Sequence, residues 1–404
     1  MRISIINGIC VTGDAISESV RGMQEAFEQL LKAECVVFTY ACELAGMKHK
    51  IVSDVSDILF DPFFMESDLI VYHFGIYYGL FDAILVGNGK AKQVVYYHNI
   101  TPKEFVALSA HRTIERSLRQ RANIASADAV WAVSAFNKDD LVEYGVNADL
   151  ITINPLYSRF TATDVAPVKS RDKIEVLYVG RFVSSKGVIE LIKAFDRAKK
   201  ATGLAMRLTM IGNVDFSDQA YLAQMRRTIC DLALDDDVEF KGKVDDDTLA
   251  GCYARSHIFA IATYHEGFCV PIVEAMRAQC VPVAYGAGNV ASLIGAHGVV
   301  VATGDWEGLG DALARTASFF DARDGAESTG QPVAWSNVEM SLAEYQAATA
   351  AYVETFSYAR FAERTAQAAL EVLSAPSSPP HLAPSSMPSR ETSATAARGT
   401  APPQ

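Results

Sequence analysis

The stretch IFAIATYHEGFCVPIVEAMRAQCVPVAY, from Ile258 to Tyr285, decides the fold class of this chain. Its first six residues form a short apolar run of the kind found in buried strands, and the run VPVAY at its end has the same character. Between them, Pro271 opens a helical segment, at a position where the missing amide proton of proline does no harm. A strand, a helix and a strand in this order predict an α/β protein with a parallel sheet covered by helices.

The same alternation runs through both halves of the chain. In the first half the β-rich runs are ISIING, CVVFTY, DLIVYHFG, QVVYYHNI and AVWAVS, with helical stretches such as SESVRGMQEAFEQLLKA between some of them. Residues 155–172 lose this periodicity and are expected to form a linker, after which KIEVLYVG and MRLTMIGN restart it. The pattern predicts two tandem doubly wound, Rossmann-like domains that face a central cleft.

Changes in composition set the expected domain limits. We expect a first domain at 1–160, a second at 161–345, closing helices at 346–373 and a tail at 374–404. The tail is rich in Pro, Ser, Ala and Thr and has almost no large apolar side chain. Such a segment cannot offset the entropy that ordering would cost, so the tail is predicted to be disordered.

Charge and cysteine content exclude several functional classes. The net charge of -12 over 404 residues argues against a nucleic-acid partner, for which a basic patch would set the affinity. The seven cysteines are odd in number and never spaced C-x-x-C, so neither a disulfide framework nor a zinc site is predicted. The start MRISIINGIC lacks the features of a signal peptide, and no run approaches the roughly 18 apolar residues of a membrane-spanning helix. We therefore expect a cytoplasmic protein.

Two carboxylates in the opening stretch raise the question of function. Glu266 falls in the loop after the first strand, and Glu274 falls about one turn inside the helix. Each could be a solvated charge, and Glu274 could simply contact the positive helix end, which is worth about 0.3–1 kcal/mol. Gly267 would let a ligand approach the backbone, and the free amides at the helix start suit a phosphate or a sugar hydroxyl.

A second loop carries the opposite charge. In LYVGRFVSSKGVIELIKAF, Arg181 and Lys186 follow a strand that ends at Gly180 and precede an amphipathic helix. Open α/β sheets bind ligands at the carboxyl ends of their strands, so a diphosphate fits here. Two solvated cations remain the alternative, and the spacing does not match a Walker P-loop.

The motifs of the second half resemble those of a known family. VGRFVSSKG, MIGN, FKGKVDDDTLAGCYARSHIFAIATYHEGFCVPIVEAM and PVAYGAGNV follow the order and spacing of the retaining, nucleotide-sugar-dependent glycosyltransferases of family four, which have the GT-B fold. GDAISESVRGM, VYHFGI, YYHNITPKEF and AVWAVSAFNKDDLVEYGV resemble the amino-terminal half of a subset associated with cell-surface polysaccharide assembly. The resemblance implies transfer of a sugar from a nucleotide-diphosphate sugar to a glycan or lipid-linked glycan, with retention of configuration.

The resemblance also implies roles for individual residues. Glu266 would hold the transferring sugar, Glu274 would accept hydrogen bonds from the donor ribose, and His98 would face the donor sugar. Without the resemblance, a histidine beside tyrosines is ordinarily a hydrogen-bonded core residue. The remaining residues expected to bind the donor are Gly13, Asp14, Arg181, Lys186, Gly267 and Phe268.

Other expectations follow from the same resemblance. No D-x-D-like pair is placed to hold a metal, so neither a metal nor a cofactor is expected. The closing helices are expected to cross back onto the first domain. Cys269 stands where glycine is frequent in the family, which leaves the shape of the sugar pocket and the donor sugar open.

Three alternatives compete with this interpretation. VAYGAGNVA contains G-x-G-x-x-A after a strand, but Gly295 and Gly298 leave too little room for the helix that a dinucleotide fingerprint requires. A glycoside hydrolase would use Glu266 and Glu274 as acid and nucleophile but would not need the two cations of the other loop. A non-catalytic sugar-nucleotide sensor or scaffold would keep the binding residues.

A basic helix face points to a further partner. In SAHRTIERSLRQRANIA, Arg112, Arg116 and Arg119 recur at spacings of four and three, with Arg121 beside them. Such a face predicts peripheral contact with an anionic membrane surface, at the inner side of the cell membrane, or with an acceptor phosphate. A solvated helix face interrupted by Glu115 is the alternative.

Overall fold

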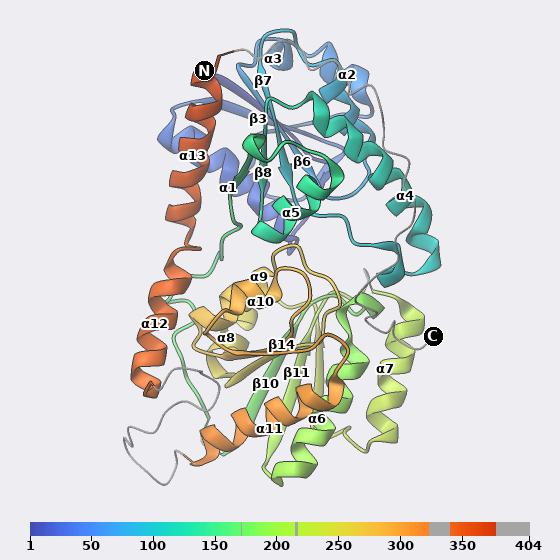
Figure 1. The fold of residues 1–404 in the computed structure, drawn as a ribbon, viewed down its shortest axis with the longest axis vertical. Helices are drawn as coiled ribbons and strands as arrows, with labels where there is room; N and C mark the ends of the chain where they lie inside the picture. Colours follow the sequence, from blue (N-terminus) through green and yellow to red (C-terminus); the bar gives the residue numbers. More distant parts are fainter. Residues whose placement is uncertain (171, 215–216, 323–339, 377–404) are drawn as a thin grey trace. The chain divides into compact units, whose positions relative to one another are not determined.

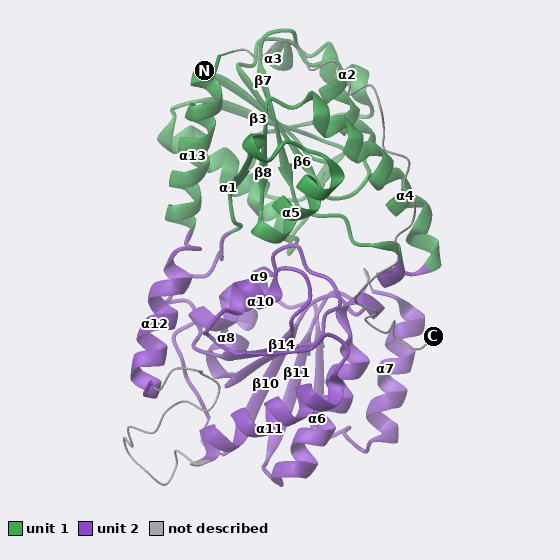
Figure 2. Ribbon diagram, viewed as in Figure 1, with its two compact units in different colours: residues 1–103, 108–156, 358–399 green, residues 104–107, 157–357, 400–404 purple. Residues whose placement is uncertain are grey.

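The computed structural model describes residues 1–170, 172–214, 217–322 and 340–376, so most of the predicted tail lies outside the described residues. These residues form two compact units (Figure 2). The first contains residues 1–103, 108–156 and the described residues from 358 on, and the second contains residues 104–107 and 157–357. Of the helices described, none combines the length and the apolar character needed to cross a membrane.

The first unit is built on a parallel sheet with the strand order β5-β3-β1-β6-β7-β8-β9. Its strands are β1 (Arg2–Ile6), β3 (Glu34–Thr39), β5 (His49–Ile51), β6 (Leu69–Phe74), β7 (Lys92–Tyr97), β8 (Ala129–Ala132) and β9 (Ile151–Ile153). A separate short pair is formed by β2 (Ile9–Cys10) and β4 (Ala41–Cys42). All six residues of β6 are buried, as expected for a central strand covered on both faces.

Helices complete the first unit, and the last of them comes from the far end of the chain. They are α1 (Ala15–Leu30), α2 (Val55–Leu59), α3 (Pro62–Met65), α4 (His111–Gln120), α5 (Ala135–Tyr144) and α13 (Tyr358–Ser374). Helix α13 packs against α1 (Figure 1). Asn154, just after β9, donates a buried hydrogen bond of 3.0 Å to the Thr365 hydroxyl of α13. The chain therefore returns to its first unit after completing the second.

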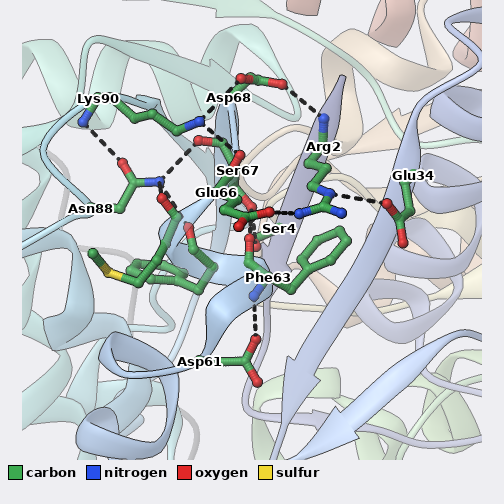
Figure 3. Close-up of polar contacts among 12 residues, drawn as sticks. Arg2, Ser4, Glu34, Asp61, Phe63, Glu66, Ser67, Asp68, Asn88 and Lys90 are labelled. Carbon is green, nitrogen blue, oxygen red and sulfur yellow. Dashed lines mark hydrogen bonds and ion pairs between the residues drawn. The ribbon is translucent and has the colours of Figure 1, made fainter.

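A polar network fixes the amino-terminal edge of this sheet (Figure 3). The Arg2 amide donates to the Asp68 carboxylate at 2.9 Å, and the Arg2 guanidinium donates to Glu34 at 3.1 Å. Deeper in, the hydroxyls of Ser4 and Ser67 share a buried hydrogen bond of 2.7 Å. These contacts hold β1 and the turn before β6 at the edge opposite to the carboxyl ends of the strands.

The second unit repeats the design with the parallel strand order β12-β11-β10-β13-β14-β15. Its strands are β10 (Ile174–Val179), β11 (Met206–Ile211), β12 (Val238–Gly242), β13 (Ile258–Ile261), β14 (Val281–Tyr285) and β15 (Val299–Val301). Its helices are α6 (Val188–Thr202), α7 (Gln219–Asp231), α8 (Asp246–Arg255), α9 (Val270–Arg277), α10 (Val290–Ile294), α11 (Trp306–Ala322) and α12 (Leu342–Glu354). The predicted pair of doubly wound parallel sheets is confirmed.

The segment predicted as a linker is packed rather than loose. Its described residues form no helix or strand between β9 and β10, yet Leu156, Phe160 and Val165 are buried. The Lys169 ammonium donates to the carbonyl oxygens of Ser256 and Ala278, which follow the carboxyl ends of α8 and α9. A cation at this place complements the negative ends of both helices and anchors the connection to the second unit.

Candidate active site

Two loops of the second unit are tied together at the carboxyl end of its sheet. The loop after β10 ends in a 3₁₀ turn (Ser184–Lys186) and Gly187, and α6 begins at the next residue. The carbonyl oxygen of Ser185 accepts hydrogen bonds from the Tyr264 amide at 2.8 Å and from the Thr263 hydroxyl at 3.2 Å. Gly187 has a φ of +58°, and a Cβ atom there would lie 2.0 Å from the Ala262 carbonyl oxygen. Only glycine permits this close approach.

The two loops bring a cation and a carboxylate into contact. Lys186 Nζ lies 2.5 Å from Glu266 Oε1, and the two side chains are 19% and 15% exposed. The sequence placed these residues in separate motifs, and the fold joins them. Arg181, the second cation of the first loop, is exposed, and its carbonyl oxygen accepts a hydrogen bond of 2.7 Å from the Tyr178 phenol.

A third loop, after β14, holds the backbone on the other side of Glu266. The Asn289 amide donates to the Glu266 carbonyl oxygen at 3.0 Å, and the Asn289 side chain donates to the Phe268 carbonyl oxygen at 3.4 Å. Gly288 has a φ of +59°, and a Cβ atom there would lie 2.3 Å from that same Glu266 oxygen. The glycines of VAYGAGNVA therefore serve contacts within the protein, and α10 spans only Val290–Ile294, too short for a dinucleotide fingerprint.

Glu274 is buried in α9, with only 5% of the residue exposed. The Tyr253 phenol donates a hydrogen bond of 2.8 Å to Glu274 Oε2, and Arg159 Nε lies 4.0 Å from Glu274 Oε1. Burial, with the nearby Glu274 charge as a second cause, raises the pKa of Tyr253 well above its usual range, so the phenol keeps its proton. These partners hold the carboxylate in one orientation, which a solvated charge at a helix end would not need.

The backbone conformation at Cys269 is one that favours glycine, the residue expected at this position from the family resemblance. Its φ of +77° lies in the left-handed region, which glycine enters freely and a side chain enters at a cost. Burial raises the pKa of the Cys269 thiol well above its usual range, and the charge of Glu266 raises it further. Position 269 thus places a neutral thiol next to Glu266.

A cluster of aromatic and acidic side chains supports these loops. The Tyr264 phenol donates to Glu190 Oε1 at 3.4 Å, and burial raises the pKa of Tyr264 to about 12 and also raises that of Glu190. The Tyr221 phenol accepts hydrogen bonds from the first two amides of α6, those of Val188 at 2.9 Å and Ile189 at 3.2 Å. None of these residues was predicted, because Glu190 and Tyr221 lie within ordinary helical patterns.

In the first unit, His98 is paired with a second histidine. His98 Nε2 lies 3.0 Å from His73 Nδ1, and the two rings stack with their centroids 5.1 Å apart. Among the described residues, His98 Nδ1 and His73 Nε2 are buried and have no hydrogen-bond partner. Burial lowers the pKa of His98 to about 3 and also lowers that of His73, so both rings are neutral at physiological pH.

Gly13 and Asp14 form the start of α1. Gly13 has a φ of +80°, and a Cβ atom there would have no neighbour within 4 Å in the described part of the chain, so backbone conformation rather than crowding favours glycine. The Asp14 carboxylate accepts hydrogen bonds of 2.8 Å from both the amide and the hydroxyl of Ser17. Asp14 is therefore the N-cap of α1, a role that already satisfies an amide of the first turn.

The arginines near α4 differ in their surroundings. Arg121 pairs with Asp140 at 3.1 Å and lies over the Tyr144 ring, so it does not belong to an open basic face as the sequence predicted. Arg116 is exposed and lies over the Tyr77 ring, with 3.5 Å between its guanidinium carbon and the ring centroid. Arg112 and Arg119 are exposed as well.

Comparison with known proteins finds similarity to a family over part of the chain. Residues 161–318 match the family model of the glycosyl transferases of group 1. The O-antigen chain mannosyltransferase B of Escherichia coli is 22% identical over 231 residues, which are 54% of this chain and 59% of that protein. The mannosylfructose-phosphate synthase of Agrobacterium fabrum is 31% identical over 163 residues, 37% of this chain and 36% of that protein. The matched residues thus span less than two thirds of the length of the first relative and about a third of the length of the second.

Solved structures match nearly the whole chain. A glycosyltransferase from Rickettsia africae has a TM-score of 0.69 at 16% identity and covers 92% of this chain and 99% of its own. The HepE protein of Anabaena, in complex with UDP-glucose, has a TM-score of 0.69 at 18% identity and covers 92% and 100%. The sucrose-phosphate synthase of Thermosynechococcus elongatus has a TM-score of 0.67 at 19% identity and covers 92% and 99%. These matches confirm the GT-B fold.

Proposed function

We propose that this chain, whose residues 161–318 match the family model of the group 1 glycosyl transferases, moves a sugar from a nucleotide-diphosphate sugar to a glycan or lipid-linked glycan, with retention of anomeric configuration. The contact between Lys186 and Glu266 carries the proposal. It puts a cation suited to phosphate beside a carboxylate suited to sugar hydroxyls. Both stand at the carboxyl ends of parallel strands, where open α/β sheets bind ligands.

The donor would be held at both of its ends. Arg181 and Lys186 would bind the diphosphate and neutralise the charge that builds on the leaving nucleotide, a role that cations held in a fixed orientation perform well. Glu274 would accept hydrogen bonds from the ribose hydroxyls, with Tyr253 holding its carboxylate in place. The two cations supply the positive charge that a divalent ion would otherwise supply, so we propose that the reaction needs no metal.

The transferring sugar would be held by Glu266 and by the amides of Gly267 and Phe268. In the reaction, the bond from the anomeric carbon to the phosphate oxygen breaks through an oxocarbenium-like state. The acceptor hydroxyl attacks from the face that the nucleotide leaves and passes its proton to the departing phosphate. Glu266 would stabilise the positive charge that develops on the sugar, which lowers the barrier only if this contact strengthens in the transition state.

The biological setting is proposed from the relatives. The similarity to an O-antigen chain mannosyltransferase supports a role in cell-surface polysaccharide assembly, at the cytoplasmic side of the membrane that carries the growing glycan. Both curated relatives have mannosyl transfer or a mannosyl product in their names, so mannose donors belong among the first to be tested.

A donor screen tests this function. Purified full-length protein is titrated calorimetrically with UDP-, GDP- and ADP-sugars, and each binder is then incubated with protein while the released sugar is followed by NMR. We expect slow hydrolysis of one donor, with the first-formed sugar in the anomeric configuration of the donor. Binding without hydrolysis or transfer would instead favour a sensor or scaffold, and an inverted first product would contradict retention. Absence of binding to any of these donors would contradict the proposed function.

A further inference from the structure

We infer that Glu266 competes with the nucleoside diphosphate for Lys186, and that this internal competition weakens binding of the spent nucleotide after the sugar has left. The inference rests on the proposed function and concerns the same site. Its basis is the ion pair of 2.5 Å between Lys186 Nζ and Glu266 Oε1, with four-fifths or more of each side chain withdrawn from solvent.

The pair is built into the fold, because the backbone on both sides of it is fixed. The Ser185 carbonyl oxygen accepts a hydrogen bond of 2.8 Å from the Tyr264 amide, so the two loops are joined directly beside the ion pair. On the far side, Asn289 donates its amide to the Glu266 carbonyl oxygen at 3.0 Å. With both backbones held, the ammonium and the carboxylate meet again whenever no ligand separates them.

Partial burial makes this contact matter for ligand binding. A pair that is mostly withdrawn from water is screened less by salt than an exposed pair, and removing one partner leaves the other charge uncompensated. A diphosphate that draws the Lys186 ammonium toward itself leaves the Glu266 carboxylate without a compensating positive charge. The Cys269 thiol beside it stays protonated, since burial raises its pKa, so it adds no negative charge next to Glu266.

The substrate and the product differ in the hydrogen-bond donors that they offer to Glu266. A nucleotide sugar brings hydroxyl groups that donate to the carboxylate as Lys186 turns to the phosphates. A nucleoside diphosphate brings no such donor, so its phosphates must share Lys186 with Glu266. The ion pair therefore weakens binding of the product more than binding of the substrate. After transfer, the Glu266 carboxylate pairs with Lys186 again, which weakens the contact between Lys186 and the nucleotide phosphates.

The test compares nucleotide binding in four proteins: wild type, Glu266→Gln, Lys186→Met and the double variant. Dissociation constants for UDP, GDP and ADP are measured by calorimetry after circular dichroism has shown that each variant is folded. Glu266→Gln keeps the size of the side chain but removes its charge and therefore its ion pair with Lys186. We therefore expect the preferred diphosphate to bind about tenfold more tightly. Lys186→Met should weaken binding, and in the double variant the gain from Glu266→Gln should vanish.

A matched control separates this competition from a general change of charge. Glu175→Gln removes one negative charge from the same unit at the start of β10, at the opposite edge of the sheet, where Glu175 lies 3.6 Å from Lys173. The distance along the strand to the site exceeds the roughly 8–10 Å over which salt screens charges, so diphosphate affinity should not change.

The outcomes distinguish the inference from the function beneath it. If wild type binds a diphosphate and Glu266→Gln binds it equally or less tightly, the competition does not exist although the proposed function stands. If Glu175→Gln gains as much as Glu266→Gln, the effect is one of overall charge and the inference is wrong. If wild type binds none of the three diphosphates and none of their sugars, the proposed function fails and the inference fails with it.

Discussion

His98 Nε2 and His73 Nδ1 lie within hydrogen-bonding distance, 3.0 Å apart, at the ends of two neighbouring strands, and burial lowers the pKa of both rings. The unfolded chain takes up protons on these rings below a pH of about 6.5, whereas folded His98 does so only near pH 3. The unfolded state thus binds more protons in this window, and stability falls as the pH drops from about 6.5. We expect His98 to account for a loss on the order of 2 kcal/mol between pH 7 and pH 5.

Urea unfolding at pH 7, 6 and 5 measures this loss. In the variant His98→Gln, which has no titrating ring at that position, the decline toward pH 5 should be smaller than in wild type. An equal decline in both proteins would show that His98 does not titrate as its burial requires.

The charged residues of the candidate site could be identified from the sequence, but the side chains that they contact could not. Lys186 and Glu266 stand out because each follows a strand within a glycine-containing loop. Their pairing depends on β10 and β13 lying side by side, which no local pattern specifies. Tyr253, which orients Glu274 from 21 residues away, was missed because a tyrosine within a helical pattern is ordinarily a core residue.

At the scale of the helix, α6 offers a matched pair of glycines. Gly187 and Gly203 stand at its two ends with φ of +58° and +67°, so alanine is strained at both. Only at Gly187 would the added Cβ meet a backbone oxygen, that of Ala262 at 2.0 Å. We expect Gly203→Ala to cost about 1–2 kcal/mol and Gly187→Ala at least about 2 kcal/mol more.

Chemical denaturation of both variants measures the difference, and donor turnover gives a second comparison. Gly187→Ala should also lower turnover, because the displaced backbone carries Lys186, whereas Gly203→Ala should leave turnover close to that of wild type. Equal stabilities would mean that the close approach of α6 to the end of β13 is not a constraint.

The exposed arginines of α4 lead to a prediction about membranes. Arg112 and Arg119 are exposed, and Leu108 just before the helix is 82% exposed. A basic residue near an anionic surface contributes about 1 kcal/mol, so replacing both arginines with glutamine should weaken binding to anionic vesicles roughly thirtyfold. Co-sedimentation with anionic and with neutral vesicles provides the measurement.

Arg121→Gln is the control for this experiment, because the Arg121 side chain is engaged with Asp140 and should contribute little to vesicle binding. If wild type sediments equally with anionic and neutral vesicles, or if the double variant sediments as wild type does, α4 is simply a solvated helix face.

Regular elements of sufficient length were predictable, and the shortest ones were not. Helices α1 and α6 follow from helical patterns, and five strands of the first sheet follow from apolar runs. The strands β2, β4, β5 and β9 have only two or three residues, too few to show alternation. Strands β5 and β9 form at the edges of the first sheet, beside β3 and β8, whereas β2 and β4 pair with each other, so all four depend on partners that are distant in the sequence.

At the scale of the whole chain, the final described helix and the tail beyond it should behave in opposite ways on truncation. A chain that ends at Ser374 should keep the thermal stability of the full protein, because the remaining segment has few groups able to pack. A chain that ends at Ser357 loses α13, whose Phe361 is fully buried. Since burying one such side chain is worth about 1.5–3 kcal/mol, we expect the first unit to be strongly destabilised.

Calorimetric melting of the two truncated chains checks this prediction. A marked loss of stability on removal of the tail alone would mean that residues after 374 pack on the protein. An unchanged melting profile without α13 would mean that its contact with α1 contributes nothing to the fold.

The fold of the whole chain was predictable because repeated strand and helix patterns and several motifs in register point to one architecture. The return of the chain to its first unit was expected only through the family resemblance. In physical terms it depends on the small buried face of α13, and Ala366 and Ala369 on that face also fit any amphipathic helix. Composition and periodicity therefore give the layers of each unit but not which unit the last helix joins.

Steady-state kinetics of Glu266→Gln and Glu274→Gln with varied donor would show whether Glu266 acts on the transferring sugar and Glu274 on the nucleoside. Losing a charged hydrogen bond costs about 1.5–3 kcal/mol, so each defect should be on the order of tenfold to a hundredfold. We predict that Glu266→Gln lowers kcat at saturating donor, whereas Glu274→Gln chiefly raises the donor KM. If both folded variants changed only KM, or if neither changed anything, these roles would be contradicted.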